Sequence, residues 1–239
     1  MKHKAKKSDN SQKKITSSIS HTNWTSLPTT IKWLQKQRKS FKTPNRIGNW
    51  LQRSRGVNAT IIMLSASCLE GFFVECLESF VGPWEMYPNN TFQNRLTKDL
   101  GKRISVATFA QFPDLFKITL GQPLSESIED LNEGIRVLID FRNIVAHARS
   151  TTYQSFDPPY SENEDYEVEK QSRTIHSYLK KKKLITGTEN LFTNEVADHF
   201  ASLVKPYINE VLTLLPPVQS DNVIHLVNYA YQDDPEFDA

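Results

Sequence analysis

Large apolar residues recur every three or four positions along most of this chain, the spacing that places side chains on one face of an α-helix. Alternation with a period of two, which is typical of strands, is scarce, and the 239 residues include only 8 glycines. The pattern therefore predicts an all-α fold, an up-and-down helical bundle with additional helices. The expected helices begin at Pro28, form a short turn at Ile47–Leu51, and then cover Asn58–Phe80, Asn90–Ile104, Phe109–Leu120, Ser125–Ala148, Tyr166–Lys183 and Thr193–Leu215.

The segment Asn58–Phe80 is the most apolar of these helices, and its apolar residues cover most of the helix circumference. We expect it to be the most buried helix, with Asn58 as its N-cap and Gly82-Pro83 at its end. Glu70 interrupts the apolar run. Because an unpaired charge is costly to bury, Glu70 is expected either to pair with a cation, such as an arginine of another helix, or to point outward at the rim.

The helix over Ser125–Ala148 has an apolar seam with one position missing. The members of the seam are Ile128, Leu131, Ile135, Leu138 and Val145. Arg142 occupies the position where the pattern requires a leucine, a departure that is more typical of a functional or specifically paired residue than of an accident. Asn143 and His147 are four residues apart and share a helix face, whereas Arg142 and His147 are separated by a rotation of about 140°.

These residue types suit the cleavage of a phosphodiester. Arg142 is a permanent cation whose planar fork fits phosphate oxygens, and His147 titrates near neutrality and can transfer a proton. With RNA, the 2′-hydroxyl supplies the nucleophile, so no metal is required. Because the two side chains lie on different helix faces, a compact site would need both residues from each of two chains, lining a cleft across a symmetric interface. The structural alternative is that Arg142 pairs with a buried acid such as Glu70, while His147 caps the helix C-terminus.

The run from Arg142 to His147, at the end of a long helix in an all-α chain of this size, resembles the HEPN superfamily. The hallmark of that superfamily is an arginine followed by four to six residues and a histidine, often with an asparagine directly after the arginine. The overall pattern is most similar to stand-alone HEPN proteins of the RiboL-PSP and MAE type. The apolar helix with Ser67-Cys68-Leu69-Glu70 also resembles the early HEPN helix, which often carries an acidic residue.

The resemblance implies a metal-independent endoribonuclease with no cofactor, built as a HEPN-like helical bundle that works as a homodimer. Arg142 would bind or polarise the scissile phosphate, His147 would act as general base or acid, and Asn143 would orient His147 or the phosphate. Glu70 would support Arg142. Members of this kind commonly act as toxins or phage-defence effectors, and a neutralising or activating protein partner controls them.

One position departs from the HEPN toxins that are paired with a nucleotidyltransferase antitoxin. In those toxins a tyrosine follows two positions after the histidine, whereas this chain has Arg149 there, and its nearest tyrosine is Tyr153. We therefore do not expect that partnership, and Arg149 could instead add a third cation to the RNA cleft. A second class of function stays open, in which the chain is a non-catalytic helical module that dimerises and regulates a neighbouring enzyme or senses nucleotides.

Charge is arranged in blocks, although the formal net charge is only +2. Residues 1–20 hold six lysines and one aspartate, and the last nine residues hold four acids. These blocks predict a disordered Lys-rich tail at residues 1–28, a helical domain at 29–216 and an acidic tail at 217–239, in which residues 223–227 could dock on the body. The Lys-rich tail and Lys180–Lys183 could also bind nucleic acid, but such runs are usually solvated.

Cys68 and Cys76 lie eight residues apart on one expected helix, about 12 Å along its axis, too far for a disulfide. Reduced core thiols, no secretory signal and no run of about 18 apolar residues predict a cytoplasmic protein without a membrane contact. Phosphate-loop, serine-hydrolase and zinc-protease motifs are absent and the histidines are scattered, so no metal site is expected. His176 and His199 are expected at the surface.

Overall fold

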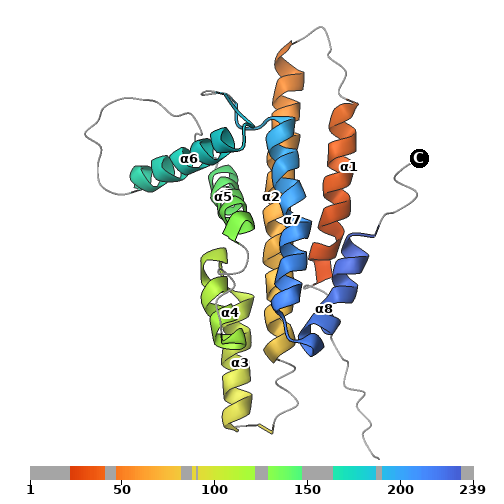
Figure 1. Cartoon of the computed structure of the whole chain (residues 1–239), viewed down its shortest axis with the longest axis vertical. Helices are drawn as coiled ribbons and strands as arrows, with labels where there is room; N and C mark the ends of the chain where they lie inside the picture. Colours follow the sequence, from red (N-terminus) through yellow and green to blue (C-terminus); the bar gives the residue numbers. More distant parts are fainter. Residues whose placement is uncertain are drawn as a thin grey trace, which may run out of the picture.

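The computed structural model describes residues 22–40, 47–81, 88–89, 91–121, 129–146, 164–186 and 190–232. Its elements are η1 (Thr22–Ser26), α1 (Leu27–Lys39), α2 (Ile47–Val81), α3 (Phe92–Ser105), η3 (Phe109–Gln111), α4 (Phe112–Leu120), α5 (Glu129–Ala146), α6 (Glu164–Lys181), α7 (Asn194–Leu214) and α8 (Pro217–Ala230). No strand occurs in these ranges, which confirms the all-α prediction (Figure 1).

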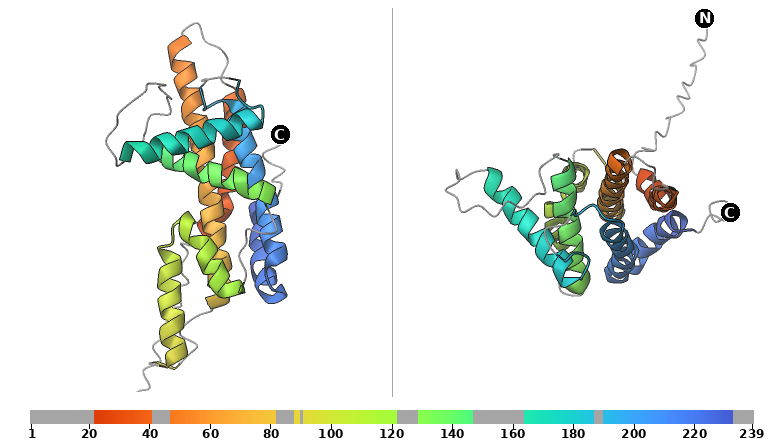
Figure 2. Two further views of the ribbon diagram at one scale, coloured as in Figure 1. Left: turned by 60° about the vertical axis from the view of Figure 1, so that its left-hand side comes forward. Right: turned by 90° about the horizontal axis from the view of Figure 1, so that it is seen from above.

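The long helix α2 forms the axis of the bundle, with α1, α7 and α8 alongside it (Figure 1). α7 runs parallel to α2. Asn58 of α2 contacts Asn194, the first residue of α7, and nearer the C-terminal ends of both helices the rings of Phe73 and Tyr207 lie 6.0 Å apart. Helices α5 and α6 lie across this group, as Figure 2 shows, with α5 in contact with both α2 and α7. α5 is therefore held from two sides, and α6 packs on its outer face.

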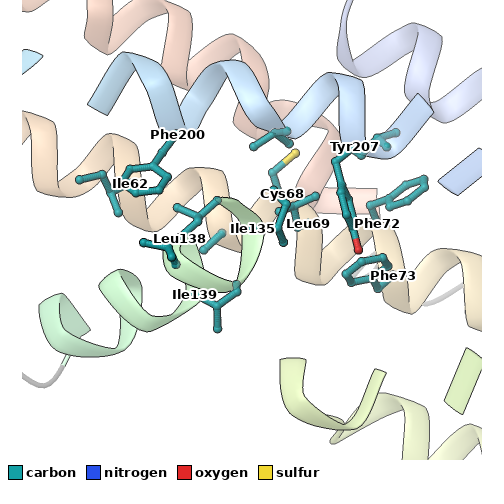
Figure 3. Packing of buried hydrophobic residues seen from close by; sticks show 14 of the residues in the cluster. Ile62, Cys68, Leu69, Phe72, Phe73, Ile135, Leu138, Ile139, Phe200 and Tyr207 are labelled. Atoms are coloured by element: carbon teal, nitrogen blue, oxygen red, sulfur yellow. The ribbon is translucent and has the colours of Figure 1, made fainter. Parts of the chain in front are cut away.

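The core lies where α2, α5 and α7 meet. Figure 3 shows the inward-directed side chains of these helices, among them Ile62, Leu69, Ile135, Leu138, Phe200 and Tyr207. Each of these six residues is less than 5% exposed. Ile135 and Leu138 of the predicted α5 seam are therefore confirmed as buried. Burial of each such side chain stabilises the fold by about 1.5–3 kcal/mol, before the loss of conformational entropy is subtracted.

The helix α2 is longer than the sequence pattern predicts, and Asn58 is not its N-cap. α2 begins at Ile47 and continues through Asn58, which is fully buried in the helix interior. The Asn58 side chain accepts a hydrogen bond from Arg38 (2.8 Å) and donates to the Phe192 carbonyl (2.9 Å) and to Asn194 Oδ1 (3.0 Å). Asparagine favours helix ends, which is why the sequence predicts a cap at Asn58, but in the structure Asn58 joins α1, α2 and the start of α7.

Both predicted tails contribute ordered structure. Residues 22–28, assigned to the N-terminal tail, form η1 and the first residues of α1, and Trp24 is only 3% exposed and packs edge-on against Phe72. Residues 217–230, assigned to the acidic tail, form α8, whose Val223 and Val227 are buried. Polar composition dominates the sequence pattern of both segments, but these few apolar residues are enough to hold each segment on the bundle.

Several helix ends follow their local chemistry. Pro28 lies in the first turn of α1. Backbone N–H groups of the first turn have no acceptor within the helix, so the lack of an N–H in proline costs no hydrogen bond there. Thr91, rather than Asn90, caps α3 by accepting a hydrogen bond from the Asn94 backbone N–H, and Asn90 lies outside the described residues. Thr193 caps α7 in the same way, and α7 continues through Pro206 without ending there.

Cys68 and Cys76 are both buried and free, as expected for core thiols. Burial raises the pKa of the Cys68 thiol to about 12, so it is inert as a nucleophile at neutral pH. By length and composition the segment Leu51–Val81 could span a membrane, contrary to the expectation that no such run exists. That segment is the axis of the bundle, and 56% of its most apolar window is buried among the other helices, as in the core helix of a globular protein.

Candidate functional site

The side chain of Arg142 is directed from the last turns of α5 toward α2. One guanidinium nitrogen donates to Glu70 Oε2 at 2.8 Å, and the other donates to Asn143 Oδ1 at 3.0 Å. Of the two charged side chains, 31% of Arg142 and 24% of Glu70 remain exposed. The expected partnership between Arg142 and an acid of another helix is therefore present, and Glu70 is that acid.

Glu70 lies in the middle of α2, in an environment that disfavours its charge. Burial raises the pKa of the Glu70 carboxyl above its ordinary value, and the charge and hydrogen bond of Arg142 only partly offset this effect. The ion pair is thus not a source of large stability by itself. What it does supply is orientation, because two hydrogen bonds from different nitrogens fix the plane of the guanidinium.

Arg142, Asn143 and Glu70 come together in the structure and are the described members of the predicted site. α5 ends at Ala146, and His147 and Arg149 lie outside the described residues. Asn143 Oδ1 accepts a hydrogen bond from Arg142, and the role of Asn143 in orienting His147 or the phosphate stays a prediction. The described part of the site is therefore a fixed cation at the end of α5, open to solvent on one side.

A second polar pair joins α6 to α7, and the sequence did not indicate it. The Tyr178 hydroxyl of α6 lies 2.8 Å from Nε2 of His199 on α7. Burial, together with the positive charge of Lys182, lowers the pKa of His199, and burial with the nearby charge of Glu133 raises the pKa of Tyr178 to about 12. Both side chains are therefore neutral at neutral pH and form a neutral hydrogen bond.

His199 and His176, which are expected at the surface, are each only partly exposed. The position of His199 could have been read from the α7 pattern. It follows Val196 by three residues and precedes Leu203 by four, so it stands on the edge of the buried stripe. No comparable sequence pattern links it to Tyr178, which is 21 residues away on another helix.

Metal ligands do not gather in the described part of the chain. Within it, no three His, Cys, Asp or Glu side chains lie close enough to hold an ion together. The chemistry available at the described site is instead that of a guanidinium beside a carboxylate and an amide, a set that binds an anion if the carboxylate is displaced or protonated. Comparison of the chain with protein-family models, with curated proteins and with solved structures finds no match.

Proposed function

We propose that this chain is a metal-independent endoribonuclease that cleaves RNA at a composite site, formed by the Arg142-to-His147 segments of two copies of the chain. Arg142 binds a non-bridging oxygen of the scissile phosphate. His147 removes the proton of the 2′-hydroxyl, whose oxygen attacks phosphorus, and the 5′-oxygen leaves and takes up a proton. The products are a 2′,3′-cyclic phosphate and a 5′-hydroxyl, with no water consumed in this step.

The observation that supports the proposal most is the state of Arg142. It is a cation where the seam of α5 would otherwise carry an apolar residue, it is held in one orientation by Glu70 and Asn143, and nearly a third of its side chain is exposed. A cation fixed before substrate arrives loses little entropy on binding phosphate. Its place five residues before His147 completes the Arg-x4-His pattern that resembles the HEPN superfamily.

The proposed protein acts in the cytoplasm, as a toxin or a phage-defence effector whose activity a partner protein restrains or triggers. Support for the cytoplasmic setting comes from the two free, buried cysteines. The homodimer is part of the proposal because helical spacing would separate Arg142 and His147 by a rotation of about 140°, so that one copy would make a poor site.

A second candidate function is a non-catalytic helical module that dimerises and regulates another protein. The pairing of Arg142 with Glu70 inside one chain favours it, because this contact alone satisfies the charge that breaks the α5 seam. In that case the arginine serves only to join α5 to α2. The two functions make opposite predictions for RNA cleavage.

The test is cleavage of a 5′-labelled single-stranded RNA by the full chain with EDTA present. Wild type is expected to cut, while His147→Ala and Arg142→Ala are expected to lose about a hundredfold or more of the rate. Arg103→Ala is the matched control, because Arg103 also forms an ion pair with a carboxylate, Asp99 at 3.1 Å, on the exposed surface of α3.

Several outcomes separate the candidates. Loss of cleavage in the two site variants but not in Arg103→Ala supports the ribonuclease, provided that the fragments carry a cyclic phosphate. Intact RNA with wild type, or equal cutting by all variants, contradicts it. Light scattering of the same proteins measures their mass in solution, and a strictly monomeric but active chain would contradict the composite site.

A further inference from the structure

One side of α1 carries a row of cations. Lys32, Lys36 and Lys39 follow one another at spacings of four and three residues, which places them on one face of the helix, and all three are exposed. Trp33 borders this face and is 45% exposed. α1 contains no acid, and the sequence has none from residue 10 to residue 69. These three lysines, the lysine row, therefore have no carboxylate partner on their own helix.

Acids are also scarce on the described elements that contact α1. η1 contains none, and the first acid of α2, Glu70, pairs with an arginine of α5. On α7, Asp198 pairs with the buried arginine of α1, and Glu195, one turn before it, is exposed. Asp221 of α8 lies about 15 Å before the end of that helix. The first two members of the lysine row each take part in a polar or electrostatic interaction, but these elements supply the row with little negative charge.

The last described residue, Gln232, lies near the start of the lysine row. The Tyr231 hydroxyl lies 3.8 Å from Cys68 Sγ in the middle of α2, and Trp24, just before α1, packs against Phe72 of the same helix. η1 and α1 both contact α8. α8 therefore ends beside the beginning of α1, as Figure 1 shows.

The lysine row extends from this point along the side of α1 that borders α7. Gln35 lies three residues after Lys32 and four before Lys39, so it is next to the row, and its amide donates to Asp198 of α7. Measured from Leu27, the first residue of α1, Lys32 lies about 8 Å and Lys39 about 18 Å along the helix axis. A segment that continues from α8 along this side passes all three lysines.

Four acids follow Gln232 in the sequence. Residues 233–239 lie outside the described residues and read Asp-Asp-Pro-Glu-Phe-Asp-Ala, with no base among them. Seven extended residues span up to about 23 Å, which is enough to reach the end of the lysine row. A fourth cation lies at the start of this path, because Lys205 Nζ of α7 is 5.3 Å from the ring centroid of Tyr231. Four acids thus follow directly on a surface with four cations.

We propose that the acidic segment 233–238 docks along the lysine row of α1. Its acids pair with Lys205 and with the three lysines, and Phe237 packs on the exposed ring of Trp33. Each exposed ion pair is weak by itself, so the contact depends on several pairs acting together. The docked segment covers the cations of α1 with acids of the same chain, so a polyanion binds this face only by displacing the segment. The proposal is independent of the ribonuclease proposal and has its own tests.

Carbodiimide crosslinking of the full chain tests the contact. The reagent activates a carboxylate, a lysine amine that touches it displaces the activating group, and an amide forms while the carbodiimide leaves as a urea. Mass spectrometry of the digested protein should find amides between residues 233–238 and the lysine row at least about tenfold more often than amides to Lys180. Lys180 is the matched control, because it is an exposed lysine of α6, which lies across the bundle from α1 (Figure 2).

Two further conditions show whether the contact is ionic and lies within one chain. About 1 M salt screens charges beyond about 3 Å and should make these amides scarce. In a mixture of isotope-labelled and unlabelled protein, a contact within one chain gives no amide between a labelled and an unlabelled peptide. Frequent mixed amides would place the segment on a second copy instead.

Binding of a single-stranded oligouridine, followed by fluorescence anisotropy, tests whether the segment masks the lysine row. A variant with a neutral segment should bind at least about fivefold more tightly than wild type. Its changes are Asp233→Asn, Asp234→Asn, Glu236→Gln and Asp238→Asn. The gain should disappear when the row is neutralised as well, by Lys32→Gln, Lys36→Gln and Lys39→Gln. It should persist when exposed lysines of other helices are changed instead, by Lys102→Gln, Lys117→Gln and Lys180→Gln.

Each result decides the proposal. Amides to the lysine row within single chains, together with a gain in affinity that needs the row, support it. It is overturned if amides to the row are no more frequent than amides to Lys180, persist in high salt, or join different copies. Unchanged affinity of the neutral-segment variant overturns it, as does an equal gain with and without the lysine row, because added positive charge alone would then explain the binding.

Discussion

The carboxylate of Glu70 and the guanidinium of Arg142 lie 2.8 Å apart, across the contact between α2 and α5. Arg142 stands at the position of the α5 seam where the pattern predicts an apolar side chain, and Glu70 neutralises its charge. The pair leaves Arg142 fixed yet partly exposed, which is the state required of an anion-binding residue. Because burial raises the pKa of Glu70, the pair also makes a pH-dependent contribution to stability.

Glu70→Gln is expected to change stability little at neutral pH and to change its pH dependence. The raised pKa means that the folded protein holds this proton more tightly than the unfolded chain, so the wild type loses stability as pH rises from about 4.5 through the raised pKa. Gln keeps an acceptor for Arg142 without this loss. Urea denaturation should show the variant gaining on the wild type from about pH 4 to about pH 7, within about 1 kcal/mol of it at pH 7. A relative loss over that range would mean that the ionised carboxylate is stabilising.

The neutral hydrogen bond between Tyr178 and His199 predicts sensitivity to mild acid. The pKa of His199 is lowered in the folded protein, so the unfolded chain binds the proton more readily. The contribution to stability is complete above about pH 6.5 and is lost as pH falls through the lowered folded pKa. His199→Gln should remove this part of the decline between about pH 7 and about pH 5, measured as the denaturation midpoint at each pH. His225→Gln, on the exposed face of α8, is the control, and an identical effect of both substitutions would contradict the assignment to His199.

Asn58 joins three helices, and its loss should be costly. Asn58→Ala leaves the Phe192 carbonyl without its donor and Arg38, whose side chain is only 4% exposed, without one acceptor. Unpaired buried polar groups cost about 1–3 kcal/mol each, so we expect a destabilisation of about 2–4 kcal/mol in urea denaturation. Asn58→Asp keeps the acceptor but loses both donors and should also destabilise. A loss below about 0.5 kcal/mol in both variants would show that water replaces the network.

Lys181→Gln provides an exposed comparison for the loss of stability in the Asn58 variants, because it breaks the ion pair between Lys181 and Glu133 at the surface. Exposed pairs of this kind contribute about 0–1 kcal/mol. The contrast between the two sites tests whether burial, rather than the number of polar contacts, sets the cost.

The architecture followed from periodicity because a repeat of three to four residues leaves few alternatives to packed helices. The seam of α5 and the dense apolar pattern of α2 predicted the two helices that meet at the core, and the arginine in that seam predicted its acidic partner. The tails were harder to predict, since Trp24, Val223 and Val227 are few apolar residues in polar segments, and only the bundle shows the surfaces they cover.

The candidate site was predictable as far as one helix extends. The sequence singled out Arg142 and Asn143, but it could not show that the Asn143 side chain accepts a hydrogen bond from Arg142. The packing of Phe73 against Phe112 and Tyr207 was not predictable, because these rings come from three helices whose crossing is set by tertiary packing. Likewise, two of the three partners of Asn58 lie more than 130 residues away in the chain, so the local pattern around Asn58 indicated only a helix cap.

Gly71 and Gly101 make a matched pair for testing how closely η1 packs on α2. A Cβ at Gly71 would lie 2.4 Å from Cβ of Trp24, whereas a Cβ at Gly101 would meet no atom within 4 Å. Ala in place of a helical Gly contributes about 1 kcal/mol, while forcing a side chain into a filled core costs about 1–3 kcal/mol. Gly101→Ala should therefore raise the free energy of unfolding by about 0.5–1 kcal/mol, and Gly71→Ala should lower it by about 1–2 kcal/mol.

Thermal denaturation, with the fluorescence of the buried Trp24 region followed alongside circular dichroism, measures both effects. If Gly71→Ala is stabilised as much as Gly101→Ala, then η1 does not rest on α2 as closely as the structure shows. Trp24→Gly removes the Cβ and Cγ atoms nearest the new methyl group, so it is expected to cost less in the Gly71→Ala background than in the wild type. Two substitutions that merely added their separate costs would show instead that the residues do not contact each other.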